Sequence, residues 1–330
     1  MKDKPRFITP FGLKFMFFFL ACGVVFFAAV PTDAMAEVEV HFLYALSNFD
    51  GPIPYNWANI SVDEANQETY VVDTRERDVA VFNQYGMEVY RFGDDGSLGT
   101  VIDVAVKADG KILLFSKAGS RPSIKLCNFR GEAISELELR NFPAAFSNFS
   151  PDRMVYRQGM IYLLDSGSLR IAVTDSSGLF HNGYDLGSLL GITDSRKREV
   201  TQPGGFNVDH EGNMLFTIPV LFKAYKLSPD GKLTEFGRPG SAPGKFNIVA
   251  GIAADDNYYY VADRLKSAVL VFDHDFQFQK EFGYRGIRPD NLIGPKNLAL
   301  DGNGRLYVSQ VRSRGVSVFQ ITDKPKTEEP

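Results

Sequence analysis

Basic residues recur along this 330-residue chain, each time in a polar segment that follows a short apolar run. The recurring residues are Arg75, Arg77, Lys117, Arg121, Arg170, Lys223, Arg264, Lys266, Arg312 and Arg314. A guanidinium binds carboxylate or phosphate oxygens through two parallel hydrogen bonds, and an ammonium attracts the same groups as a point charge. If the fold brings these segments to one face, the pattern predicts a basic rim that recruits anionic partners.

Acidic residues stand beside several of these cations, which leaves a second interpretation open. The acidic neighbours are Asp73, Glu76, Asp78, Asp165 and Asp263. Exposed ion pairs are weak and partly screened. If all the rim cations paired with these neighbours, however, the rim would have little positive electrostatic potential. The residues that we expect to contact a partner are Arg75, Arg77, Arg121, Arg170, Arg264, Lys266, Arg312 and Arg314.

Patterns that indicate catalysis or a bound cofactor are missing from the sequence. The four histidines share no metal-ligand spacing, and C-x-x-C, H-E-x-x-H and G-x-x-x-x-G-K-[ST] do not occur. Asp-Gly pairs are frequent, but tight turns require them and the distal Glu of a calcium-binding hand is lacking. We therefore expect no catalytic residues and no cofactor.

The segments that must position the rim belong to a repeat that occurs six times. In its clearest copy, Tyr260-Val261-Ala262-Asp263 is followed by Val269-Leu270-Val271-Phe272-Asp273. The matching first aromatic or aliphatic residues are Tyr70, Leu113, Tyr162, Phe216, Tyr260 and Tyr307, which lie 43 to 54 residues apart. Short runs rich in Val, Ile, Tyr and Phe predict strands, and this period suits a four-stranded blade. The sequence therefore predicts an all-β, six-bladed β-propeller with antiparallel blades.

The ends of the repeat array predict how the ring closes. Residues 37–49 form an extended alternating stretch, whereas the sixth copy runs out at Ile321 without a fourth apolar run. We expect the N-terminal stretch to supply the outer strand of the last blade, because this removes open sheet edges. One propeller domain would then span residues 37–321, followed by a disordered tail over 322–330.

The widest spacing in the array, 54 residues, separates the third and fourth copies. The excess falls in residues 185–199, which contain Arg196, Lys197 and Arg198. In a propeller, connections between blades share one face with the loops between second and third strands. We therefore expect this insertion loop to add its three basic residues to the rim.

The repeat resembles the NHL-repeat family, whose blades carry a G-I-A-V-D, Y-V-A-D, V-F-D and F-G cadence. Residues 251–255 and 260–263 carry the match most clearly, and the resemblance covers residues 55–321. Family members are mainly recognition scaffolds, which implies a non-catalytic propeller that binds an envelope or extracellular protein or an anionic polymer. By analogy with exported bacterial members, a redox protein is one candidate partner.

Six-bladed relatives also include metal-dependent lactonases and amidating lyases, whose ligands point into the central tunnel. The corresponding residues here, at the starts of first strands, are Asn59, Asp103, Asp152, Asn207, Asn247 and Asn297. This resemblance keeps an alternative open, a metal-assisted hydrolase or lyase with one calcium or zinc ion near Asn59, Asn207 and Asn297. Asn and Asp also cap turns where strands begin, and no Glu or His accompanies them.

Residues 1–36 have the pattern of a secretory signal peptide. Lys2, Lys4, Arg6 and Lys14 precede an apolar block, and Ala34-Met35-Ala36 provides a cleavage site. Its removal would change the formal net charge from −4 to −6, since the segment holds four basic and two acidic residues. We expect a periplasmic or extracellular protein that binds no nucleic acid, with a retained N-terminal membrane anchor as the alternative.

Overall fold

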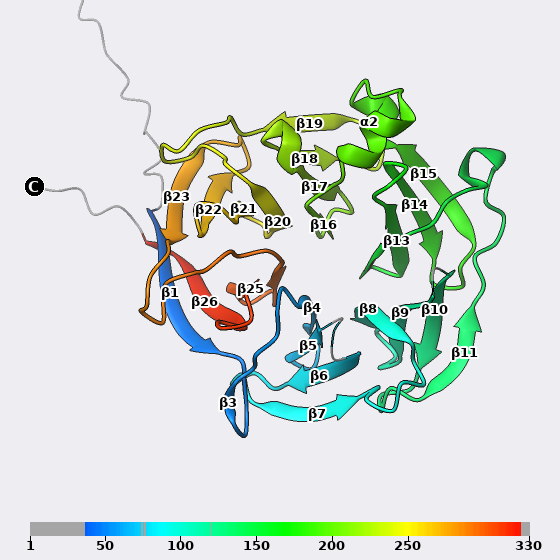
Figure 1. Cartoon of the computed structure of the whole chain (residues 1–330), viewed down its shortest axis with the longest axis horizontal. Coiled ribbons are helices and arrows are strands. Elements are labelled where there is room, and N and C mark those ends of the chain that lie inside the picture. The colour runs from blue at the N-terminus through cyan, green and yellow to red at the C-terminus, as the bar shows by residue number, and fades with distance from the viewer. Residues whose placement is uncertain (1–36, 74, 76, 120, 325–330) are drawn as a thin grey trace, which may run out of the picture. The chain divides into compact units, whose positions relative to one another are not determined.

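The structure, a computed structural model, describes residues 37–73, 75, 77–119 and 121–324. Six four-stranded antiparallel sheets are arranged as the blades of a ring (Figure 1). The expected signal peptide lies outside the described residues. Among the described residues, no helix is both long and apolar enough to cross a membrane.

Blades 1 to 3 follow one another along the chain. Blade 1 contains β4 (Asn59–Asp63), β5 (Glu68–Asp73), β6 (Asp78–Phe82) and β7 (Glu88–Phe92). Blade 2 contains β8 (Thr100–Val106), β9 (Ile112–Ala118), β10 (Arg121–Cys127) and β11 (Ala133–Leu137). Blade 3 contains β12 (Arg153–Arg157), β13 (Met160–Asp165), β14 (Arg170–Asp175) and β15 (Phe180–Asp185). A short 3-10 turn, η1 (Ala144–Phe146), lies between blades 2 and 3.

Blades 4 to 6 complete the circle. Blade 4 contains β16 (Gly205–Val208), β17 (Met214–Ile218), β18 (Lys223–Leu227) and β19 (Leu233–Phe236), with η2 (Pro219–Leu221) before β18. Blade 5 contains β20 (Val249–Ala254), β21 (Tyr258–Asp263), β22 (Ala268–Asp273) and β23 (Phe278–Gly283). Blade 6 contains β24 (Leu298–Leu300), β25 (Arg305–Ser309), β26 (Val316–Lys324) and β1 (Glu37–Ala45). All six repeated aromatic or aliphatic positions fall in second strands, as the period predicts.

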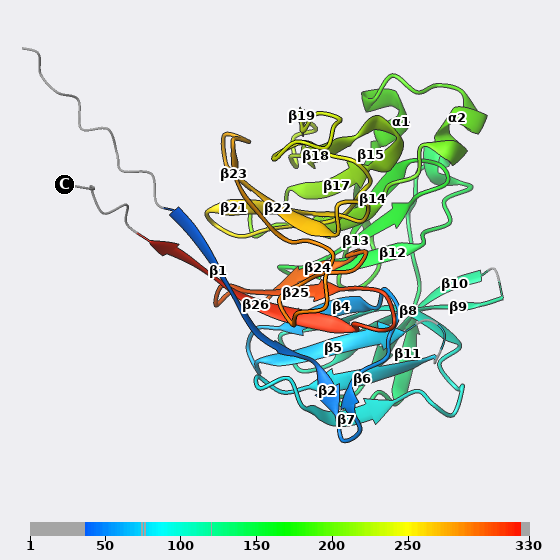
Figure 2. The same ribbon diagram turned by 60° about the vertical axis from the view of Figure 1, so that its left-hand side comes forward.

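The N-terminal strand closes the ring, which confirms the prediction. β1 pairs antiparallel with β26, from Glu37 opposite Lys324 to Ala45 opposite Ser317 (Figure 2). Because β1 offers a partner, β26 continues to Lys324, three residues past the expected end of the propeller at 321. Residues 325–330 of the expected tail lie outside the described part of the chain. After β1, the short strands β2 (Ser47–Asn48) and β3 (Gly51–Pro52) form a hairpin that precedes blade 1.

The core is divided into six apolar clusters, and each fills the interface between two consecutive blades. Between blades 5 and 6, for example, Tyr260 and Val271 meet Leu306 and Phe319. A second strand is therefore covered on both sides, which explains why β21 (Tyr258–Asp263) is a continuous buried run rather than an alternating one. The blades are held together by burial of apolar surface, since Cys127 is a free thiol.

The insertion between blades 3 and 4 folds into two short helices, whereas the sequence indicated a loop. They are α1 (Leu186–Leu189) and α2 (Ser195–Val200). Each begins at an aspartate whose side chain accepts a backbone N–H of the first turn: Asp185 from Ser188 and Asp194 from Lys197. These N-caps stabilise helices that are too short to form without them.

Strand register defines two faces of the ring. Asn59 lies opposite Val72 and Arg153 lies opposite Leu164, so first strands begin where second strands end. We call the face with these starts, with the connections between blades and with the segments between second and third strands the loop face. The opposite face, which carries the tight turns between first and second strands, is the turn face.

Candidate functional site

The acidic residues that end the second strands accept hydrogen bonds from backbone N–H groups. Asp73, Asp165 and Asp263 are buried, with exposed fractions of 3%, 6% and 0%. Asp263 accepts the backbone N–H groups of Asn247 at 2.6 Å and Lys266 at 3.0 Å. Asp73 and Asp165 anchor their loops in the same way. Within the described residues, none of the three forms an ion pair with a basic side chain, so they shape the loop face without neutralising it.

The expected rim residues divide into exposed and engaged groups. Those exposed on the loop face are Arg75, Arg77, Arg121, Arg264 and Arg312. The engaged ones are Lys266, Arg170 and Arg314: Lys266 binds Glu281 at 2.9 Å, Arg170 is half-buried 4.0 Å from Asp185, and Arg314 donates to the Gly286 carbonyl. Burial and hydrogen bonding hold these three in the scaffold, and five exposed arginines carry the positive charge of the rim.

The helical insertion contributes only part of its basic group. Arg196 and Lys197 are exposed on α2. Arg198 lies 2.7 Å from the Asp185 carboxylate and donates to the carbonyls of Ser168 and Ile192 at 3.0 Å each. Arg198 therefore fastens α2 to blade 3, and its guanidinium is not free to contact a partner.

First strands of all six blades line a central cavity of about 150 Å³. Four of the six expected tunnel positions, Asn59, Asp103, Asn207 and Asn297, are among its lining residues. The other two serve elsewhere: Asp152 accepts hydrogen bonds from Ser166, and the Asn247 backbone donates to Asp263. In place of these two residues, Arg153 and Gly251 line the cavity.

The tunnel asparagines join neighbouring blades. The Asn297 side-chain nitrogen donates to the carbonyls of Trp57 and Ala58 and to the Asn59 side-chain oxygen, at 3.0, 2.9 and 2.8 Å. Asn59 in turn donates to the Ile102 carbonyl at 2.7 Å. Three surrounding acceptors fix which end of the Asn297 amide faces them. These bonds link blade 6 to blade 1 and blade 1 to blade 2.

These residues do not fit a calcium or zinc ion. The oxygen of Asn59 already accepts from Asn297, and that of Asn207 accepts the Val208 N–H at 2.8 Å. The cavity lining contains two carboxylates: Glu64 is paired with Arg157, and Arg153 and Lys296 lie beside Asp103. No group of three His, Cys, Asp or Glu side chains suited to a metal occurs in the described part of the chain. The donor set therefore lacks the several carboxylate or imidazole ligands that these ions prefer.

At the loop-face end of the tunnel lies a group of residues that the sequence did not predict to lie together. We call Trp57, Asp103, Arg153, Arg264 and Lys296 the mouth cluster. The Arg264 guanidinium carbon lies 4.4 Å and the Lys296 Nζ 5.7 Å from the centre of the Trp57 ring. Asp103 accepts the Met154 N–H at 2.9 Å. Asp103 and Arg264 were expected at other sites, and Trp57, the one tryptophan of the chain, is the sequence feature that could have indicated this group.

Charge in the mouth cluster is unbalanced, and the pKa values reflect this. Burial, reinforced by Arg153 and Arg264, lowers the pKa of Lys296 to about 8. Burial raises the pKa of Asp103 to about 6, although Arg153 and Lys296 favour its ionised form. Arg153 and Lys296 thus lie near a carboxyl group that burial and the neighbouring Asp152 make reluctant to ionise, and Arg264 adds a third positive charge beside Lys296.

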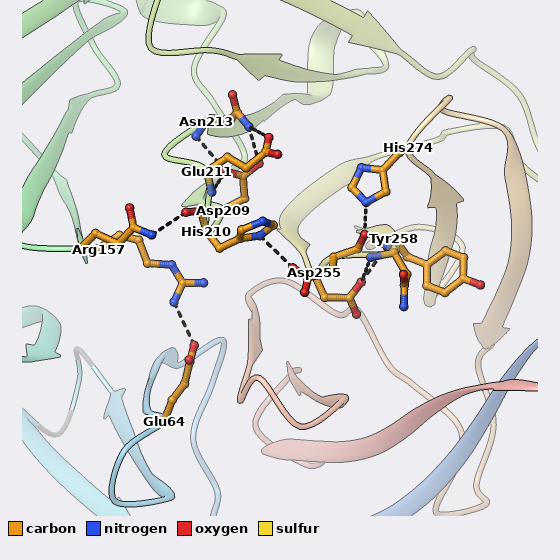
Figure 3. A network of polar contacts seen from close by, with 12 residues as sticks. Glu64, Arg157, Asp209, His210, Glu211, Asn213, Asp255, Tyr258 and His274 are labelled. Carbon is orange, nitrogen blue, oxygen red and sulfur yellow. Dashed lines mark hydrogen bonds and ion pairs between the residues drawn. The ribbon is translucent and has the colours of Figure 1, made fainter.

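The other end of the tunnel differs in character. On the turn face, Arg157 of blade 3 reaches across to Glu64 of blade 1 at 2.9 Å, and His210 lies 3.1 Å from Asp256 (Figure 3). A cavity of about 500 Å³ adjoins this network, and its lining includes Asp255, Asp256 and Asp323. The turn face is therefore acidic around the tunnel, whereas the mouth cluster is basic.

No known protein family and no curated protein matches this sequence. Its fold is similar to that of a Bacteroides thetaiotaomicron protein of unknown function, at 12% identity and a TM-score of 0.62 over 87% of this chain and 77% of that one. Virginiamycin B lyase from Staphylococcus aureus is similar at 12% identity and a TM-score of 0.59. The match covers 87% of this chain and 100% of the lyase. Regucalcin, a calcium-binding protein from Agrobacterium tumefaciens, is similar at 14% identity and a TM-score of 0.56. The match covers 87% of this chain and 99% of regucalcin.

These structures are six-bladed propellers, and at such low identity the likeness concerns the fold alone. Both a lyase and a calcium-binding protein share it, so the fold does not decide between binding and catalysis. Function has to be inferred from the residues of this chain.

Proposed function

We propose that this protein is an exported, non-catalytic binding propeller of the periplasm or extracellular space. Its loop face would hold an anionic partner, either another envelope or extracellular protein or an anionic polymer. The observation that supports this is the separation of roles on that face: buried aspartates bind the backbone, and exposed arginines keep their charge. The NHL resemblance supports a recognition scaffold, and a redox protein remains a candidate partner by analogy.

The charge distribution favours specific recognition of an anionic partner over nonspecific binding. Without residues 1–36 the chain has a formal charge of −6. A basic face on an acidic protein orients the approach of an anionic partner, because the acidic remainder of the molecule repels that partner. We do not propose the metal-assisted hydrolase or lyase, because the oxygens of Asn59 and Asn207 already accept hydrogen bonds and the described residues offer no group of carboxylate or imidazole ligands there.

Binding to a defined anionic polymer tests the proposal. Polyglutamate binding would be measured at low and high salt with the chain lacking residues 1–36. Replacing Arg75, Arg77 and Arg312 by Glu should weaken binding at low salt at least tenfold, and added salt should weaken wild-type binding, because the attraction is screened. A matched control replaces Lys111, Arg130 and Lys232, exposed on the turn face, by Glu. It changes the net charge equally and should bind several-fold more tightly than the rim variant.

The same pair of variants tests partner identity in extracts of the native envelope. Proteins captured by the wild type and by the turn-face control, but lost with the rim variant, are the expected partners. Equal polyglutamate binding by both variants would contradict the proposed role of the loop face.

A further inference from the structure

Three basic side chains converge at the loop-face end of the tunnel with few acceptors of their own. Arg153 donates to the carbonyl of Asp152 at 3.0 Å. Among the described residues, no hydrogen bond or ion pair engages the side-chain nitrogens of Lys296 or Arg264. Both cations instead lie against Trp57, at 5.7 and 4.4 Å from its ring centre. Donors held in place without protein acceptors are suited to receive an anionic group from outside.

Trp57 is held as a rigid wall of this opening. Its backbone adopts a left-handed φ of 53°, which is rare for a bulky residue. Two hydrogen bonds keep it there: its N–H donates to the Gln310 carbonyl at 2.8 Å and its indole N–H to the Gly294 carbonyl at 2.9 Å. Because the surrounding structure maintains a strained aromatic residue beside unengaged cations, a binding role is the simplest account.

We propose that the mouth cluster is a binding site for a single carboxylate group, which enters the tunnel from the loop face between Arg153, Lys296 and Arg264. Carboxylate is the anionic group that acidic proteins and uronic-acid polymers have in common. The proposal rests on the proposed function, because it names the group by which an anionic partner is anchored. It adds a specific pocket to a rim that otherwise acts through diffuse charge.

The net positive charge of the pocket explains its selectivity. Arg153, Lys296 and Arg264 outnumber Asp103 and the neighbouring Asp152, so an entering carboxylate is attracted and a cation is repelled. One Asp103 oxygen accepts the Met154 N–H, and the other accepts no hydrogen bond from the described residues. Burial raises the pKa of this carboxyl group to about 6, so its protonated form can donate to the entering carboxylate. Of the mouth cluster, Asp103 and Arg153 also line the central cavity of about 150 Å³, so a carboxylate held there would lie at the entrance of that cavity.

Fluorescence of Trp57 provides a specific test, because it is the one tryptophan in the chain. The probes are sodium glucuronate and a blocked tripeptide, acetyl-Gly-Glu-Gly-amide, at constant ionic strength. Glucose and the matching glutamine tripeptide are the uncharged controls. We expect a saturable change with both carboxylates, mutual competition between them, and no change with the controls. If only the peptide binds, the carboxylate comes from a protein partner, and if only glucuronate binds, from a polymer.

Variants of Lys296 separate this site from the rim. Lys296→Met should weaken carboxylate binding at least tenfold, Lys296→Arg should retain it, and Lys232→Met, at an exposed position on the turn face, should leave it unchanged. Circular dichroism would verify that each variant is folded. Linear, unsaturable responses, equal affinity in Lys296→Met, or tighter binding of inorganic phosphate would each overturn the carboxylate site.

Polyglutamate binding, measured in parallel with the rim variant, keeps the two proposals distinguishable. If polyglutamate binding depends on the rim but Trp57 fluorescence does not respond to carboxylates, the carboxylate site is contradicted and the proposed function is not. Glucuronate binding at the mouth without rim-dependent polymer binding would leave the pocket and remove the proposed role of the rim.

Discussion

Lys296 combines burial with two neighbouring arginines, and its pKa falls to about 8 for these reasons. At pH 8 about half of its amines would be neutral, compared with less than about 1% for an ordinary lysine of pKa 10.4. Lys296 should therefore react with an acylating reagent at lower pH than the exposed Lys111 and Lys232. Mass spectrometry of samples labelled between pH 6 and 10 would give each midpoint. A midpoint above 10 for Lys296 would contradict the mouth cluster as described.

The raised pKa of Asp103 should make the stability of the folded protein depend on pH. Its pKa of about 6 in the folded protein exceeds the value near 3.9 expected after unfolding, so the folded state binds more protons between these values. The contribution of this group to stability is present below pH 4 and is lost as the pH rises through 6. Compared with Asp103→Asn, the wild type should gain about 2 kcal/mol between pH 7 and pH 4. Urea unfolding at both values would measure this, and a pH-independent difference would argue against the raised pKa.

The exposed rim arginines were predictable from the sequence, because each blade repeats the same loop and their spacing follows that repeat. The mouth cluster was not, since Trp57, Asp103, Arg153, Arg264 and Lys296 come from five different blades. They lie as far apart as residues 57 and 296, and only closure of the ring brings them together. The engagement of Lys266, Arg198 and Arg314 also depends on tertiary neighbours that no local pattern reveals.

At the scale of elements, strands were more predictable than connections. Apolar runs buried between two blades give a strong signal, as in Tyr258–Asp263. The helices of the insertion were missed because they span only four and six residues and depend on the caps Asp185 and Asp194. An aspartate followed by polar residues is equally typical of a turn, so the local sequence does not distinguish the two.

In blades 1, 3, 4, 5 and 6, the residue immediately before the third strand is left-handed. In blade 6 this residue is Gly315, but in blade 4 it is Phe222, with φ of 55°. A side chain in this conformation costs about 1 kcal/mol, which glycine avoids. Phe222→Gly should therefore be more stable than Phe222→Ala by about 1 kcal/mol, since both remove the same exposed ring. Chemical denaturation of the two variants measures the difference, and a more stable alanine variant would show that the loop relaxes.

At the scale of the whole molecule, the six-bladed ring and its closing strand were predictable because the repeat leaves its last copy one strand short. The exact end of β26 was not predictable, because its length depends on how far β1 (Glu37–Ala45) pairs with it. Closure also determines function as proposed, because the mouth cluster needs blade 6 beside blade 1. The bonds from Asn297 to Trp57 and Asn59 cross that junction.

The closing strand should therefore control both stability and carboxylate binding. Val38 of β1 is 2% exposed and packs in the cluster between blades 5 and 6. Val38→Asp would bury an unpaired carboxylate and should cost at least about 3 kcal/mol of unfolding free energy. His41→Asp places the same group on the same strand where the side chain is 63% exposed, and should change stability by about 0.5 kcal/mol or less. Denaturation measures both, and detachment of β1 should also expose the edge of β26 and promote association. If the Val38 variant matched the His41 variant in stability and in Trp57 response to glucuronate, the ring would not depend on its N-terminal strand.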